Sequence, residues 1–192
     1  MRIALKEWAV AVEAMARGEQ IALVRKGGIR EEGREFRVEH ERFLLFPTYE
    51  HQRADLLQPA YAPRLAGVLA AWGGSATVTV TAWGEVTDSY ALTTQEAVDR
   101  LAPYYVYTTG YAEERLRWKP RKPLQALVVR TYLLDEPITL PMLAEYGGCR
   151  SWISLERDLP ALTMRPALPD GLFEQRRAEV RSLLEGLPAG VA

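Results

Sequence analysis

The feature that most constrains this fold is a strict alternation of residue types near the middle of the chain. Ala76, Val78, Val80 and Ala82 alternate there with Thr77, Thr79, Thr81 and Trp83. Because successive side chains of a β-strand point to opposite faces of a sheet, this pattern predicts a strand with one set on each face. The largely apolar run Leu124–Leu134 predicts a second strand. The centre of the chain is therefore expected to be a sheet.

Helical patterns flank this sheet. Apolar residues recur at helical spacing over Leu5–Arg17, where Gly18 is a suitable stop, and over Pro63–Trp72. Thr94 is a suitable N-cap for a short helix after it, and residues 172–187 form an amphipathic C-terminal pattern. Shorter runs predict strands in residues 20–25 and 151–155 and a hairpin in residues 29–48.

Together these elements predict an α+β fold. The 192 residues suffice for one domain with a buried core, which we place at residues 1–158. Residues 159–192 are expected to be a proline-rich linker and a helix packed on that domain. Lys6, Glu7 and Glu13 interrupt the apolar N-terminal stretch, so neither a signal peptide nor a membrane span is predicted. With a single cysteine as well, we expect a cytoplasmic protein.

The sequence contains no self-sufficient catalytic or metal-binding signature. His40, His51 and Cys149 are scattered, whereas a zinc site uses three or four such ligands at close spacing, so neither a metal nor another cofactor is predicted. Cys149 is expected to be a packed residue, although its neighbour Arg150 would favour a reactive thiolate. No catalytic residue can be assigned on this basis.

A segment rich in aromatic and basic residues precedes the second predicted strand, and we expect it to be a loop. Its members are Tyr104, Tyr105, Tyr107, Tyr111, Arg115, Arg117, Trp118, Lys119, Arg121 and Lys122. This mixture can stack bases while it neutralises phosphates. The net charge of −1 means that any such contact has to come from a local patch of this kind. The alternative is that the aromatic rings fill the edge of the core and the basic side chains cover them.

Residues Gly18–Arg25 resemble the G-x-K-x-x-E-x-R motif of ASCH domains, which belong to the PUA-like superfamily of small β-barrels. Gly18 and Arg25 match the motif, whereas Gln20 and Leu23 stand at its Lys and Glu positions. Those two positions carry catalytic or ligand roles in ASCH enzymes. The resemblance therefore implies binding more strongly than catalysis.

Residues 76–145 are similar to the middle of EVE domains, in which a glycine-containing strand, a Tyr-rich connector and a strand entering a Pro-Leu turn follow in order. The whole chain, through the stretches RKGGI, LFPTYEHQ and GGCRSW, also resembles a bacterial family known only as a domain of unknown function. These resemblances imply a PUA-like small mixed β-barrel flanked by helices.

The superfamily implies a cleft that binds RNA or DNA, with an aromatic cage for a modified or flipped base in its EVE and YTH branches. For this chain the resemblance implies a cage of Trp83, Trp118 and Trp152, with Ser151 reading the base edge. The remaining nucleic-acid-binding residues we expect are Arg25, Lys26, Tyr104, Tyr105, Arg117, Lys119 and Arg121. Trp8 and Trp72 are expected to be core residues.

Two other functions remain open. An ASCH-like hydrolase or nuclease would use Arg25 and Lys26 to stabilise an anionic transition state, with Glu50 or His51 as the general base. A partner-binding protein would use the apolar side of the C-terminal helix, for example to complete a homodimer.

Overall fold

The computed structural model describes residues 2–25, 29–32, 35–38, 40–117, 124–148, 151–156 and 163–185. Most strands belong to one mixed sheet with the order β2-β7-β6-β5-β1-β8, and β9 pairs with β7. These strands are β1 (Ile3–Trp8), β2 (Ala22–Arg25), β5 (Arg42–Thr48), β6 (Thr77–Leu92), β7 (Leu124–Pro141), β8 (Trp152–Ser154) and β9 (Met164–Pro166). A separate hairpin contains β3 (Ile29–Glu32) and β4 (Glu35–Val38).

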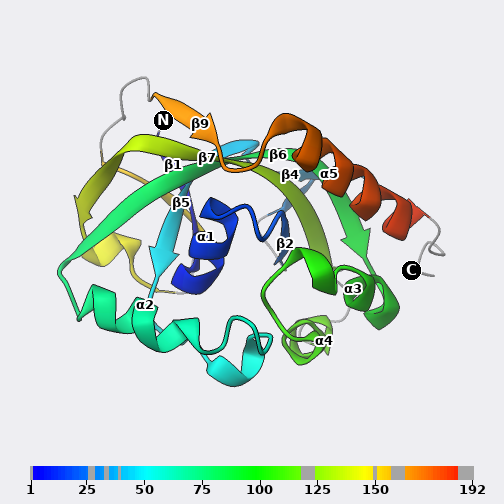
Figure 1. The fold of residues 1–192 in the computed structure, drawn as a ribbon, viewed down its shortest axis with the longest axis horizontal. Helices are drawn as coiled ribbons and strands as arrows, with labels where there is room; N and C mark the ends of the chain where they lie inside the picture. The colour runs from blue at the N-terminus through cyan, green and yellow to red at the C-terminus, as the bar shows by residue number, and fades with distance from the viewer. Residues whose placement is uncertain are drawn as a thin grey trace.

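Five α-helices surround the strongly curved sheet, which arches over the first of them (Figure 1). They are α1 (Ala9–Ala16), α2 (Arg64–Trp72), α3 (Gln95–Arg100), α4 (Thr109–Arg117) and α5 (Asp170–Glu185). Short 3-10 turns cover Ala54–Leu56, Ala102–Tyr104 and Ala144–Tyr146. The predicted α+β class, with a curled mixed sheet, flanking helices and a C-terminal helix, is confirmed. None of the helices in the described ranges combines the length and the hydropathy that a membrane crossing requires.

The long β6–β7 ribbon is the backbone of the sheet, and two irregularities interrupt its register. The shifts lie between Val80 and Ala82 and between Val86 and Asp88. Because a register shift exchanges the two faces of a strand, the predicted alternation does not continue past the first shift. Trp83 accordingly packs in the same cluster as Val78 and Val80, not on the face of the threonines.

The N-terminal helix is shorter than predicted. Residues Ile3–Trp8 form β1, which pairs in parallel with β5 and antiparallel with β8, and α1 begins only at Ala9. The predicted end is confirmed, since Gly18 has a φ of 70° just after the helix. Pairing with two neighbouring strands outweighs the helical spacing of Leu5 and Trp8, since an apolar run this short fits either structure.

Two more local predictions need correction. The expected loop after Tyr107 contains α4, and the predicted linker contains β9, which pairs with β7. The Thr94 cap is confirmed, because its side chain accepts a hydrogen bond from the Ala97 amide at 3.2 Å. Gly73, in the left-handed conformation, ends α2 as predicted.

The C-terminal helix α5 packs at the end of the sheet that contains β2, β7 and β6. Phe173, Val180 and Leu184 are buried in the same cluster as Val24 of β2 and Leu124 of β7. The apolar side of α5 is therefore used within this chain.

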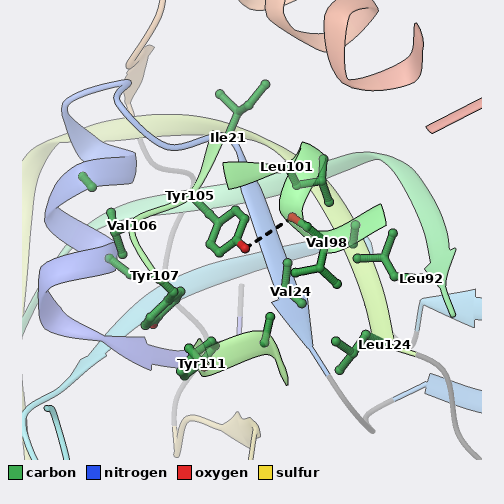
Figure 2. Packing of buried hydrophobic residues seen from close by; sticks show 14 of the residues in the cluster. Ile21, Val24, Leu92, Val98, Leu101, Tyr105, Val106, Tyr107, Tyr111 and Leu124 are labelled. Carbon is green, nitrogen blue, oxygen red and sulfur yellow. Dashed lines mark hydrogen bonds between the residues drawn. The ribbon is translucent and has the colours of Figure 1, made fainter. Parts of the chain in front are cut away.

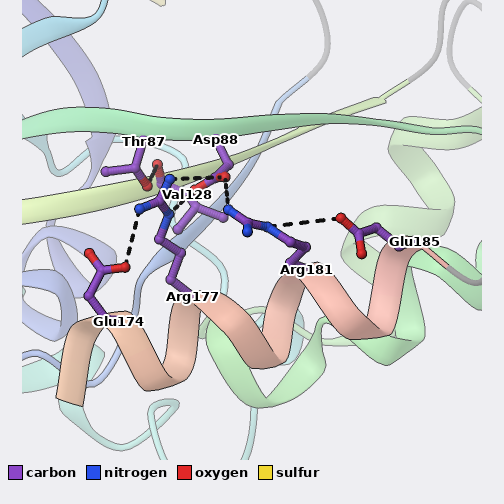
Figure 3. Close-up of polar contacts among 7 residues, drawn as sticks. All are labelled: Thr87, Asp88, Val128, Glu174, Arg177, Arg181 and Glu185. Carbon is purple, nitrogen blue, oxygen red and sulfur yellow. Dashed lines mark hydrogen bonds and ion pairs between the residues drawn. The ribbon is translucent and has the colours of Figure 1, made fainter. Parts of the chain in front are cut away.

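A polar cluster also fastens α5 to β6 (Figure 3). Asp88 follows the second register shift, and its carboxylate accepts hydrogen bonds from Arg177 at 2.5 Å and Arg181 at 3.2 Å. Burial, the largest influence, raises the pKa of the Asp88 carboxyl, but hydrogen bonds from Arg177, Thr87 and Arg181 outweigh it. The net result is a pKa below the ordinary value. The folded protein therefore favours the charged form of Asp88.

This cluster predicts a specific loss of stability in acid. A carboxyl whose pKa is lower in the folded protein stabilises it above the unfolded pKa of about 4, and this contribution is lost as the pH falls through the folded value. At pH 7 we expect Asp88→Asn to lower the free energy of unfolding by about 1–2 kcal/mol, because both arginines are partly exposed and screened. Urea denaturation at several pH values between 3 and 7 measures the difference from wild type, which should shrink below pH 4.

The matched control is Asp55→Asn, which removes the exposed ion pair with Arg53. Because this pair is exposed and screened by solvent, the midpoint of the variant should stay close to that of wild type at every pH, with a much smaller change than for Asp88→Asn. A constant deficit for Asp88→Asn down to pH 3 would contradict the assignment.

Candidate nucleic-acid interface

The strand register places the end of β2 beside the start of β7. Arg25, the last residue of β2, is the cross-strand partner of Gln125 at the start of β7. The chain continues from Arg25 to Lys26, and it enters β7 from residues 118–123, both outside the described residues. Chain connectivity alone therefore joins Lys26 and the Trp118–Lys122 segment to neighbouring positions of this edge.

Arg25 itself is held in a buried ion pair. Its guanidinium donates to Oε2 of Glu7 at 2.6 Å and to the Lys6 carbonyl at 3.1 Å. The side chains of Arg25 and Glu7 are only 14% and 4% exposed. A buried carboxylate is tolerated only where it is paired and hydrogen-bonded, and here the pair joins β2 to β1.

Tyr107 completes this polar centre. Its hydroxyl donates to Oε1 of Glu7 at 2.6 Å, and the Trp8 amide donates to the same oxygen at 2.8 Å. The Tyr107 ring stacks on Tyr111 with 3.9 Å between centroids, and Trp8 meets both rings edge-on. Figure 2 shows Tyr107 and Tyr111 beside β2 within the central apolar cluster. The start of α4 is thereby fixed against the ion pair.

The environment of this centre shifts the pKa values of Arg25 and Tyr107. Burial, the largest influence, lowers the pKa of the Arg25 guanidinium, but the charge of Glu7 and its hydrogen bond outweigh burial and leave that pKa raised. Burial, followed by the charge of Glu7, raises the pKa of the Tyr107 hydroxyl well above its ordinary value. The folded protein therefore favours the charged form of Arg25 and the protonated hydroxyl of Tyr107.

The two motif positions that depart from the ASCH pattern have structural roles. Gln20 is buried, donates to the Ala22 carbonyl at 2.8 Å and accepts from the Val106 amide at 3.2 Å. Leu23 is fully buried in an apolar cluster. Gln20 connects the residues just before β2 to the segment before α4, and neither Gln20 nor Leu23 provides an ionisable group.

The tyrosines of the predicted interface lie mostly in the core. Tyr105 is 2% exposed, and its hydroxyl donates to the Val98 carbonyl at 3.4 Å (Figure 2). Tyr104 is half-buried and donates to a carboxylate oxygen of Glu179 in α5 at 3.0 Å. In this conformation neither the Tyr105 nor the Tyr107 ring is open to a stacked base.

Trp83 and Trp152 lie on opposite faces of the sheet. Trp83 is 6% exposed, stacks on Tyr132 and shares a cluster with its cross-strand partner Leu44. Trp152 meets Phe43 edge-on at 5.0 Å, and Phe43, next to Leu44 along β5, belongs to the other face. These two indoles therefore do not share a cleft. Ser151, which is half-buried, accepts a hydrogen bond from the Lys6 amide through its carbonyl.

In the described part of the interface, an acidic side chain partly balances the positive charge. Arg117 is exposed at the end of α4 and pairs with Glu113 of the preceding turn. Lys26, Trp118, Lys119 and Arg121 lie outside the described residues, as does Cys149. His51 is exposed and has a φ of 59° in the turn after β5. Within the described ranges, His, Cys, Asp and Glu side chains do not gather into groups that could hold a metal ion.

Glu7 is the residue of this centre that sequence reasoning missed. The pattern IALKEW suits a helix, where a glutamate is an ordinary exposed residue. In strand β1, Glu7 lies on the same face as the buried Leu5 and therefore points inwards. A charged residue on the buried face of a strand requires a partner of opposite charge, and the partner of Glu7 is Arg25.

The sequence was compared with protein families, curated proteins and solved structures. A family model described as "Domain of unknown function (DUF1802)" matches residues 4–179. None of the curated proteins matches. Among solved structures, a crystal structure of a mutant ZmASCH protein from Zymomonas mobilis is similar at 10% sequence identity and a TM-score of 0.41. The match covers 81% of this chain and 88% of that chain.

The ion pair predicts a large difference between two glutamate variants. Glu7→Gln leaves Arg25 as a buried cation without a counter-charge, so we expect the free energy of unfolding to fall by about 3–5 kcal/mol. Glu85→Gln is the control, because Glu85 pairs with the exposed Arg42 and such a pair contributes about 0–1 kcal/mol. Urea denaturation at pH 7 measures both variants. Equal midpoints for the two would show that the pair of Glu7 and Arg25 does not anchor the fold.

Proposed function

We propose that this chain, which belongs to the family Domain of unknown function (DUF1802), is a nucleic-acid-binding module. Its binding surface is the edge where β2 ends and β7 begins. RNA or DNA would be held there through the phosphates of its backbone. Lys26, Lys119, Arg121 and Lys122 supply the positive charge, and Trp118 offers a ring for stacking.

The register of β2 and β7 carries this proposal. Because Arg25 and Gln125 are cross-strand partners, two basic segments that lie far apart in the sequence are attached to one edge. A net charge of −1 requires such a local concentration of cations for contact with a polyanion.

Arg25 has a positioning role in this proposal. Its charge is already neutralised by Glu7, and its side chain is mostly buried, so a phosphate would gain little from it. The ion pair instead holds the end of β2 in place, from which Lys26 extends. The same neutralisation disfavours Arg25 as the residue that stabilises an anionic transition state, and we favour binding over hydrolysis for this reason.

Tyr104 and Tyr105 also have supporting roles here. In the segment before α4, the Tyr105 hydroxyl donates to Val98 of α3 and the Tyr104 hydroxyl donates to Glu179 of α5. Base stacking is therefore assigned to Trp118, and the reading of a modified or flipped base would depend on it.

Salt-dependent binding tests the proposal. Fluorescence anisotropy with labelled single-stranded and duplex oligonucleotides of RNA and DNA gives the dissociation constant at several salt concentrations. The triple variant Lys119→Ala, Arg121→Ala and Lys122→Ala should bind more weakly. For a single strand, the slope of log K against log salt should fall in magnitude by about 0.7 for each phosphate that the variant no longer neutralises, so by about 2 in total.

The control removes three exposed arginines elsewhere, Arg2→Ala, Arg42→Ala and Arg165→Ala, with the same change in net charge. It should keep the wild-type slope. An equal effect in both variants would mean that only net charge matters, and the proposed edge would be rejected. Wild-type protein that binds none of the oligonucleotides at low salt would end the proposal itself.

A further inference from the structure

A groove of about 430 Å³ lies at the other end of the β6–β7 ribbon from the proposed nucleic-acid edge. Its walls come from α1, α2, the end of β5 and the first half of β6. The residues that matter for its chemistry are Glu13, Tyr49, Trp72, Thr77, Thr79 and Thr81. The volume is in the range of small-molecule sites.

The groove exists because β5 and β6 diverge. The two strands pair only between Arg42–Leu44 and Trp83–Glu85, after which β5 follows β1 as far as Thr48. The first half of β6 continues with β7 alone. Small or short side chains of α1 and α2, namely Ala9, Val12, Ala16, Val68 and Ala71, line the space without filling it.

Two aromatic rings form one wall. Tyr49 and Trp72 are stacked with 4.7 Å between centroids and 4° between planes. Trp72, which the sequence suggested as a core residue, is half-buried, and its indole N–H is buried without a hydrogen-bond partner among the described residues. The face of this stack gives the groove an aromatic surface on the α2 side.

Several polar groups of the groove can accept hydrogen bonds from N–H donors. Thr77, Thr79 and Thr81 present hydroxyls from one side of β6, because alternate residues of a strand share a face. Glu13 is the only charged residue of the lining. Hydroxyl oxygens, a carboxylate and aromatic faces all attract a cation, and the lining contains no cation to receive an anion.

We propose that this groove binds an alkylamine, an organic cation with one ammonium group on a hydrocarbon body. The ammonium group would donate to the Glu13 carboxylate and to a threonine hydroxyl. The hydrocarbon body would lie along Ala9, Val12 and Val68 beside the aromatic wall.

The present partner of Glu13 does not compete strongly with such a ligand. Glu13 pairs with Arg17 one turn further along α1, and the Arg17 side chain is 57% exposed. A pair at this spacing with an exposed arginine contributes little to stability, so an ammonium group that is partly removed from water can replace Arg17. The proposal is independent of nucleic-acid binding, because the groove and the β2–β7 edge share no residue.

Three ligands of equal length test the charge preference: hexylamine, hexanol and hexanoate. Nuclear magnetic resonance of the indole N–H groups follows each titration, and the Trp72→Phe variant identifies the resonance of Trp72. We expect hexylamine to shift this resonance in a saturable manner and hexanoate to leave it unchanged. Hexanol should bind at least ten-fold more weakly than hexylamine.

Glu13→Gln keeps the shape of the side chain and should weaken hexylamine binding at least ten-fold. Its control is Glu96→Gln, which removes the equivalent pair with Arg100 on α3, far along the sequence from the groove lining, and should bind like wild type. Equal binding of hexylamine and hexanol, equal affinities of the two variants, or no saturable shift with any ligand would each overturn the proposal.

Discussion

The buried carboxylate of Glu7 makes the interactions on which the β2 end of the sheet depends. It receives hydrogen bonds from Arg25 of β2, from Tyr107 before α4 and from the Trp8 amide at the start of α1. A carboxylate that is 4% exposed is costly to bury, and the three donors offset that cost only when all are in place. One acidic side chain thus fixes the relative positions of β1, β2 and α4, which otherwise meet mainly through apolar packing.

The register shifts of β6 have a comparable effect along the rest of the sheet. The first turns Trp83 away from the threonine face and into the cluster of Val78 and Val80. The second precedes Asp88, whose carboxylate meets the arginines of α5. Because each shift exchanges the faces of the strand, one long ribbon can supply an open hydroxyl row, a core tryptophan and a helix anchor in succession.

The general architecture could be predicted from local patterns, whereas the sites depend on pairing. The α+β class, the Thr94 cap and the glycine that ends α2 follow from periodicity and capping, which are local properties. The strand at Leu5 and the inward position of Glu7 do not follow from local properties. The apolar spacing around Leu5 suits a helix, and only pairing with β5 and β8 makes this segment a strand. Helix α4 was missed for a similar reason. Its apolar face is supplied largely by Tyr111, whose burial requires Trp8 and Tyr107 from elsewhere in the chain.

The two ends of the β6–β7 ribbon differ in the charge of the ligand that they suit. At the β2 end, Glu7 neutralises the charge of Arg25, and the proposed contacts with phosphates would use Lys26 and the basic residues that precede β7 in the sequence. At the other end, the lining of the groove contains a carboxylate and hydroxyls without a cation. An anionic polymer and a small cation would therefore bind apart from each other. The first register shift lies beside the groove and the second lies towards the β2 end, so each shift sets the strand faces at a different place along the ribbon.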